Sequence, residues 1–163
     1  MEYLLLVYEF FKTRTKLGLV IPLIVSGFVF YFSDTCLFYQ NGSNIQGNIL
    51  NVAGILLGFT ISIFAILIGG NSGSIEESRE YKTKYKLYGK EISLYTAIII
   101  GLGYITFIES ILLIISIISP IFFEVFSFVG RVLFSVSIFL LLHTILALLR
   151  VILEFYFIIT KKR

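Results

Sequence analysis

Few residues in this sequence could carry chemistry, and they lie inside apolar stretches: Glu109 and Tyr104 in 92–119, and His143 in 131–150. The two stretches would run antiparallel with a short connection, so Glu109 and His143 are expected at similar depth. A charged side chain in the middle of a bilayer costs about 3 kcal/mol unless it is paired or neutral. We therefore expect Glu109 to hydrogen-bond His143 or Tyr104, or to carry its own proton. A proton or ion path and a position reached by water are the alternatives.

A second pattern is a stripe of small or weakly polar residues along 48–70. Its members recur at offsets of three or four residues and are Asn51, Gly54, Gly58, Ser62, Ala65 and Gly69. This spacing places them on one helix face, and small residues let helix backbones approach closely in a membrane. The stripe predicts close contact, either as packing within one subunit or as a symmetric seam or pore lining between subunits.

A third pattern is the basic and aromatic segment 74–90. Ser74 followed by Glu77 matches a capping box, which predicts that a helix begins there. On such a helix the cations and the tyrosines would occupy neighbouring faces, formed by Arg79, Lys82, Lys86 and Lys90 and by Tyr81, Tyr85 and Tyr88. The segment predicts contact with anionic lipid headgroups or docking of a cytosolic partner. Direct nucleic-acid binding is not expected, because a few scattered cations make a weak phosphate footprint.

The sequence contains no recognisable arrangement of catalytic residues. It has no glycine-rich phosphate loop, no metal-ligand spacing, and no serine or cysteine with a suitable base. Asp34 is the single aspartate and Cys36 the single cysteine. We therefore expect a protein that is not an enzyme and that holds neither a metal nor a cofactor.

Four apolar stretches must position these residues, and they cover 17–37, 48–70, 92–119 and 131–150. A helix crosses the hydrocarbon core of a bilayer in about 20 residues, and its backbone groups must be paired within the protein. Hydrophobic residues form 58% of the 163 residues and charged residues 14%, too few to cover a soluble bundle. The sequence predicts a single all-α domain with four transmembrane helices.

The positive residues predict the orientation of these helices. Eleven lysines and arginines precede the first stretch, separate the second from the third, or end the chain, whereas the outer connections hold only Arg131. Positive residues are retained on the cytoplasmic side, so both termini are expected there. We expect residues 1–16 to form an inner interfacial helix. Residues 151–163 would be a cytoplasmic tail, with Arg150 paired to Glu154 at the boundary.

In size, predicted cytoplasmic termini, the small-residue second span 51–69 and the charged segment 74–91, the chain resembles the small four-span membrane components of bacterial antiphage operons. The membrane subunit of the Kiwa system is one of these. The resemblance implies a homo-oligomer in the bacterial inner membrane that senses phage or membrane disturbance and engages a cytosolic effector. The competing class is a channel or transporter, in which Glu109 and the small-residue stripe would line a conduction path.

Overall fold

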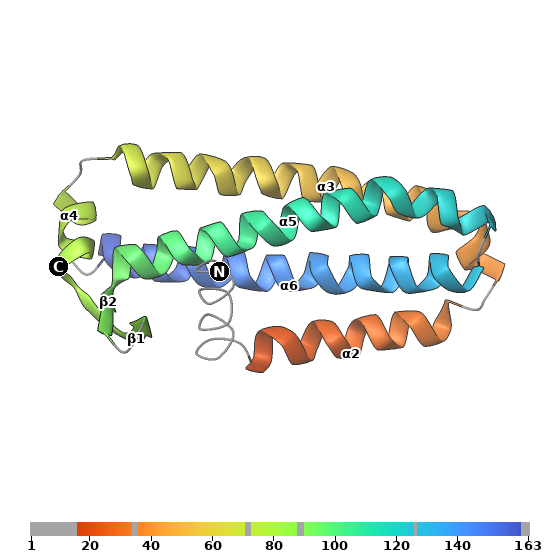
Figure 1. Cartoon of the computed structure of the whole chain (residues 1–163), viewed down its shortest axis with the longest axis horizontal. Coiled ribbons are helices and arrows are strands. Elements are labelled where there is room, and N and C mark those ends of the chain that lie inside the picture. Colours follow the sequence, from red (N-terminus) through yellow and green to blue (C-terminus); the bar gives the residue numbers. More distant parts are fainter. Residues whose placement is uncertain (1–15, 34–35, 71–72, 88–89, 126, 161–163) are drawn as a thin grey trace.

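The computed structural model of the chain is a bundle of long helices with a small hairpin at one end (Figure 1). It describes residues 16–33, 36–70, 73–87, 90–125 and 127–160. The elements are α2 (Lys16–Phe32), α3 (Cys36–Gly69), α4 (Gly73–Glu80), β1 (Lys82–Leu87), β2 (Lys90–Ser93), α5 (Leu94–Val125) and α6 (Ser127–Thr160). The interfacial helix expected over 1–16 lies outside the described residues, apart from its last one.

Within the part of the chain that the structure describes, three helices are long and apolar enough to cross a membrane, over Asn44–Gly69, Leu94–Phe122 and Phe128–Tyr156. At 26, 29 and 29 residues, each exceeds the roughly 20 residues that a bilayer core requires. A further apolar helix, α2, has 17 residues and is about 26 Å long. The chain is therefore an all-α, multi-pass membrane protein, and its described part has three helices of crossing length and one shorter apolar helix.

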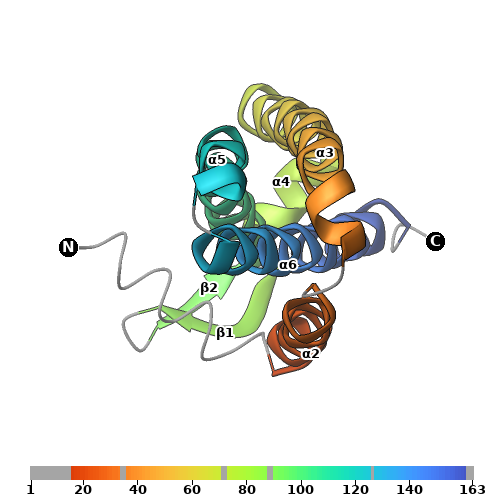
Figure 2. The same cartoon turned by 90° about the vertical axis from the view of Figure 1, so that its right-hand side faces the viewer.

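Helix α6 lies between α2 on one side and α3 with α5 on the other (Figure 2). Near the hairpin end of the bundle, Leu67 of α3 packs with Leu102 of α5 and Val151 of α6. Toward the opposite end, Ala53 packs with Leu112 and Phe134. Lipid is as apolar as these side chains, so the helices are held together by close packing and interhelical hydrogen bonds rather than by exclusion of water.

Two arginines delimit the apolar interval of α6. Arg131 donates hydrogen bonds from Nε to Ser33 Oγ (3.1 Å) and from Nη2 to Phe30 O (2.9 Å), at the end of α2. Arg150 forms the expected ion pair with Glu154, at 3.5 Å. The arginines are 19 residues apart, about 28 Å along a helix, which is close to the hydrocarbon thickness of a bilayer. The segment between them is the part that fits within lipid.

The segment after α4 is a β-hairpin, not the helix predicted over 74–90. Helix α4 ends at Glu80, and β1 then pairs antiparallel with β2, with Lys86 opposite Glu91 and Leu87 opposite Lys90. The helix prediction is therefore wrong for the part beyond Glu80. Residues before and after Glu80 do not share one helix face, contrary to the prediction from the sequence.

The composition of β1 explains the hairpin. Its sequence, Lys-Thr-Lys-Tyr-Lys-Leu, alternates charged with less polar residues at the period of a strand. Thr83 and Tyr85 are accordingly half-buried against the bundle, whereas Lys82 and Lys86 are exposed. The alternation separates a bundle-facing side from a basic side.

Two element ends also differ from the bounds of the predicted stretches. Helix α3 begins at Cys36, so residues that precede the predicted stretch 48–70 are also helical. Helix α5 passes through Pro120 to Val125 instead of ending at 119, since a proline near a helix end removes only one backbone hydrogen bond. Helix α6 runs without a break past Arg150 to Thr160, so 151–160 of the segment predicted as a cytoplasmic tail is helical.

Candidate functional site

His143 joins three helices in the middle of the bundle. Pro22 has no N–H, so the carbonyl of Gly18, four residues earlier in α2, has no donor within its own helix. His143 Nδ1 lies 2.9 Å from this oxygen, and His143 Nε2 lies 2.8 Å from the Tyr104 hydroxyl of α5. Because a carbonyl only accepts, Nδ1 carries a proton and donates it to the Gly18 oxygen. His143 therefore connects α2, α5 and α6.

Glu109 is bonded to a different helix. It is fully buried, at 0% exposure, and its Oε1 accepts a hydrogen bond from Thr60 Oγ1 of α3 at 3.2 Å. Among the described residues, Glu109 Oε2 has no hydrogen-bond partner. A single neutral donor does not compensate a carboxylate in hydrocarbon, so the surroundings fit an acid that keeps its proton.

The sequence analysis placed Glu109, His143 and Tyr104 in one cluster, and the structure divides them. Glu109 precedes the end of α5 by 16 residues and His143 follows the start of α6 by 16, so both lie about 24 Å from the α5–α6 connection. The expected similarity in depth therefore holds. The expected bond from Glu109 to His143 or Tyr104 is wrong, because those two bond each other and Glu109 turns toward Thr60.

Sequence reasoning missed the polar residues that tie α3 to the bundle. Besides Thr60, Gln46 Nε2 of α3 donates to Ser137 Oγ of α6 at 3.0 Å, and the Tyr95 hydroxyl of α5 donates to the Leu67 carbonyl at 3.4 Å. Buried hydroxyl and amide groups commonly join helices in this way. A lone threonine or serine in an apolar stretch gives no sign of which helix it contacts, so no sequence signal could have identified these pairs.

The small-residue stripe lies on the outside of α3. All of its members are exposed: Asn51, Gly54, Gly58, Ser62, Ala65 and Gly69. The buried face of α3 instead contains Gln46, Ile49, Ala53, Thr60 and Leu67. A Cβ atom added at Gly54, Gly58 or Gly69 would meet nothing within 4 Å. The stripe therefore does not pack within the subunit, and that interpretation is wrong.

Asn51 is an exposed amide near the middle of the apolar interval. The Gln46–Ser137 bond sets the level of α3 against α6, and Asn51 lies five residues further toward the hairpin end than Gln46. This places it about 16 Å from the level of Arg131, roughly half-way along the interval. The Asn51 carboxamide makes no hydrogen bond with another described residue. An unpaired amide in hydrocarbon is costly, so this position favours a partner from outside the subunit.

Glu109 and the stripe lie on opposite sides of α3. Thr60, which binds Glu109, belongs to the buried face, whereas Gly58 and Ser62 on either side of it in sequence are exposed. One conduction path lined by both features, as the channel hypothesis combined them, does not match this geometry.

The hairpin end is fixed to the long helices by aromatic and basic side chains. Arg150 Nη2 donates to the Tyr85 hydroxyl at 3.3 Å, and the Arg79 guanidinium lies 4.9 Å from the centre of the Tyr95 ring. Tyr85 is thus half-buried, whereas Tyr81 is 51% exposed. The predicted tyrosine face and four-cation face are therefore wrong. Tyr88 lies outside the described residues.

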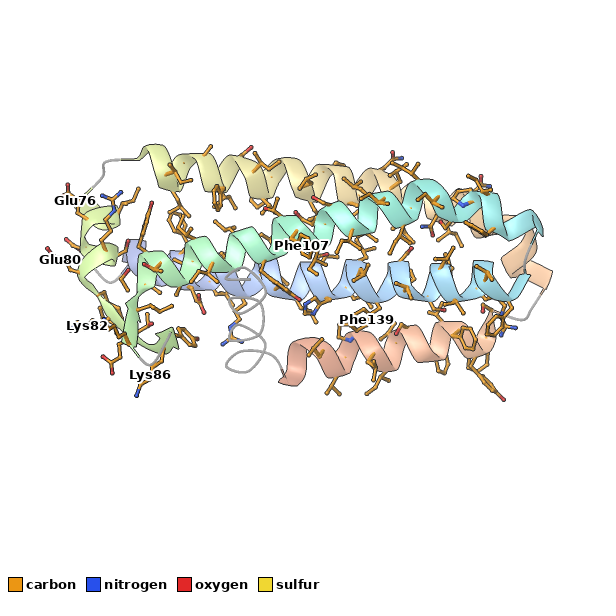
Figure 3. All side chains as sticks on the ribbon, in the orientation of Figure 1. Glu76, Glu80, Lys82, Lys86, Phe107 and Phe139 are labelled. Carbon is orange, nitrogen blue, oxygen red and sulfur yellow. The ribbon has the colours of Figure 1, made fainter. Side chains whose placement is uncertain are left out.

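Exposed charges of both signs lie at this end of the bundle. Lys82, Lys86 and Lys90 are exposed on the hairpin together with Glu91, and Glu76, Glu77 and Glu80 are exposed on α4 together with Arg79. Lys86 projects away from the helices, and Glu76 and Glu80 lie on the α4 side of the same end (Figure 3). Lysines thus predominate on the described part of the hairpin and form its basic surface, next to a helix on which glutamates predominate.

Comparisons with protein-family models, curated proteins and solved structures find no match to this chain. Within the described residues, no three histidine, cysteine, aspartate or glutamate side chains are grouped as a metal site would require. The features available to a function are the outward stripe with Asn51, the buried Glu109–Thr60 pair, and the basic hairpin.

Proposed function

We propose that the chain is a self-associating membrane scaffold or sensor that engages a cytosolic partner at its hairpin end. The observation that carries the proposal is the outward position of the α3 stripe, which begins at Asn51, an exposed amide with no hydrogen-bond partner among the described residues. In a membrane, a row of glycine and small residues is the surface on which two helices approach most closely.

A second copy of the same chain is the simplest partner for this stripe. The carboxamide of Asn51 both donates and accepts hydrogen bonds, so the same residue on two copies related by rotational symmetry could satisfy both. Closed symmetric assemblies are the commonest form of homo-oligomer. Gly54 and Gly58 leave open space on the same face, which permits backbone approach without rearrangement of the bundle.

The membrane and orientation are also part of the proposal. We place both termini and the hairpin on the cytoplasmic side of a bacterial inner membrane, supported by the concentration of lysine and arginine at the hairpin end. The interval of about 28 Å between Arg131 and Arg150 supports the placement of this segment of α6 within the hydrocarbon core. We assign the fourth crossing to α2.

The basic hairpin is the proposed docking surface. Lys82, Lys86 and Lys90 are exposed, while the strand that carries two of them is held against α6 through Tyr85 and Arg150. A rigid basic surface favours an acidic partner and sets the rate of encounter more than the affinity. The resemblance to membrane components of antiphage operons supports a soluble effector as this partner, with a role in defence.

The oligomer is tested by filling the stripe. We expect Gly58→Leu to convert the assembly to monomers, because a leucine there blocks backbone approach yet has space in the isolated subunit. Subunit number is measured by single-molecule photobleaching in liposomes, with thermal unfolding as the check on folding. Ile55→Leu, at an exposed position 73% accessible on the same helix, is the matched control and keeps the assembly. A wild-type monomer, or an unchanged Gly58→Leu assembly, would contradict the proposal.

Docking is tested by reversing charge on the hairpin. The double variant Lys82→Glu, Lys86→Glu is expected to lose the soluble protein that the wild type captures from a cytosolic lysate, while its subunit number stays the same. Charge reversal at Glu76 and Glu80 of α4, a charge change of the same size and opposite sign, is the control and retains capture. Capture that persists in the lysine variant refutes the proposed docking surface and leaves the proposal of self-association unaffected.

Proton-linked transport is a second candidate, favoured by the fully buried Glu109 with one oxygen unpaired among the described residues. Its path would run between α3 and α5, away from the stripe. Liposomes with an internal pH dye test it: flux that disappears in Glu109→Gln would support transport, and absence of flux in both proteins would exclude it.

A further inference from the structure

A groove of about 430 Å³ runs between α2 and α6. Its lining is apolar apart from two serines and includes Leu23, Gly27 and Phe30 of α2 and Val132, Ser135 and Phe139 of α6. Phe139 lies on the side of α6 that is turned toward α2 (Figure 3). The groove is on the other side of the bundle from the α3 stripe, so it is independent of the proposed self-association.

The groove exists because α2 is hydrogen-bonded to α6 at two places and has a small residue, Gly27, between them. The Phe30 carbonyl is bonded to Arg131 and the Gly18 carbonyl to His143; in each helix the two anchor points are 12 residues apart, about 18 Å. Gly27 lies between these anchors, and a Cβ added to it would meet nothing within 4 Å. The anchors prevent α2 from closing onto α6, so the space stays open.

The surroundings of the groove favour a lipid chain over water. Leu23 at its edge is 65% exposed and the neighbouring Phe28 64% exposed, as expected for a surface that faces lipid. An empty apolar groove forfeits dispersion contacts along its whole lining, and water occupies only sites with several polar partners. The groove lies within the interval between Arg131 and Arg150, where acyl chains are the abundant filling.

The polar groups at one end of the groove match a phospholipid head. The Arg131 guanidinium lies 5.0 Å from the centre of the Phe30 ring, which itself lines the groove. Ser135, four residues deeper on α6, is only 8% exposed, and its Oγ has no hydrogen-bond partner among the described residues. Guanidinium is well suited to phosphate, and a hydroxyl about 6 Å deeper is at the distance of an ester carbonyl.

From this arrangement we propose that the α2–α6 groove binds one acyl chain of an anionic phospholipid in the leaflet at the Arg131 end. The phosphate lies against Arg131 and an ester carbonyl accepts a hydrogen bond from Ser135. The lipid completes the packing of α2 on α6 between the two anchor points, as a structural component of the bundle.

The test uses the full-length protein and native mass spectrometry with phosphatidylglycerol and phosphatidylcholine. Wild-type protein is expected to retain phosphatidylglycerol preferentially. Gly27→Phe fills the groove and is expected to weaken retention at least about tenfold, since several methylene groups lose their contacts. Arg131→Gln is expected to remove the preference for phosphatidylglycerol. Ile24→Phe, a 64% exposed position on α2 that does not line the groove, is the matched control and binds as wild type.

A second measurement keeps the test valid if Gly27→Phe fails to fold. Phe139→Trp places a fluorophore in the groove of a chain that has no other tryptophan, and brominated phosphatidylglycerol should quench it at lower mole fraction than brominated phosphatidylcholine. Equal quenching by the two lipids refutes the site. So does unchanged lipid retention in a folded Gly27→Phe, or a loss of subunits in that variant, which would identify a second copy as the occupant.

Discussion

The hydrogen bond between His143 and the Gly18 carbonyl predicts an energetic coupling between Pro22 and His143, although these two residues share no hydrogen bond with each other. Pro22→Ala gives the Gly18 carbonyl a donor within α2, so His143 is no longer needed there. His143→Phe removes both of its bonds, to Gly18 and to Tyr104. Interhelical hydrogen bonds in membrane proteins contribute about 0.6 kcal/mol on average and up to about 1.7. His143→Phe should therefore cost about 1–3 kcal/mol in the wild-type chain.

In the Pro22→Ala background, His143→Phe still removes the bond to Tyr104. Loss of the bond to the Gly18 carbonyl costs little there, because the backbone N–H that the alanine supplies can replace it. We expect the cost of His143→Phe to fall by about 0.6–1.7 kcal/mol there, which is the coupling energy of the cycle. Pro22 is buried, so Pro22→Ala also leaves a cavity. That cost occurs on both sides of the cycle and cancels.

The four proteins of this cycle are compared by reversible unfolding in bicelles, with steric trapping to read the free energy. A parallel cycle of Pro22→Ala with Ser137→Ala is the control, because Ser137 bonds α3 and not α2. It should be additive within about 0.3–0.5 kcal/mol. Additivity of the His143 cycle to the same tolerance would refute the assignment of Nδ1 as the donor that replaces the missing proline N–H.

Two further predictions concern α3 and its neighbours. Glu109→Gln should change the unfolding free energy by less than about 1 kcal/mol, because an amide oxygen keeps the Thr60 bond, and stabilisation well above that would show that Glu109 is charged. Gly70→Ala should destabilise by about 1–3 kcal/mol, since a Cβ there lies 2.6 Å from both Ile66 O and Ile75 Cδ1. Gly69→Ala, whose Cβ meets nothing within 4 Å, is the control for the same assay and should be nearly neutral.

The long helices were predictable because lipid imposes length and apolarity together. The windows from Asn44, Leu94 and Phe128 coincide closely with apolar runs that any crossing helix requires. The hairpin was not predicted, although β1 alternates Lys-Thr-Lys-Tyr-Lys-Leu. The capping residues before the hairpin correctly indicated the helix α4. The cations that follow are spaced three and four residues apart, and this spacing is as compatible with a longer helix as with a strand.

The candidate site was predictable only in part, because sequence fixes depth along a helix but not rotation about its axis. Counting residues placed Glu109 and His143 at one level. Their partners depended on which way each helix is turned, and Thr60 lies 49 residues from Glu109 in the chain. The outward direction of the stripe was hidden for the same reason, since small residues indicate close contact without naming the neighbour.

The division of α3 into two faces has a consequence for how its sequence can change in length. Inserting a single residue between Gly54 and Gly58 would turn the rest of the helix by about 100° and misalign Thr60 with Glu109 and Gly58 with Gly54 at once. Inserting seven residues, almost two full turns, would restore the direction of both faces to within about 20°. It would still shift Thr60 about 10 Å along the axis and away from Glu109, so this segment of α3 cannot change in length without losing one of the two contacts.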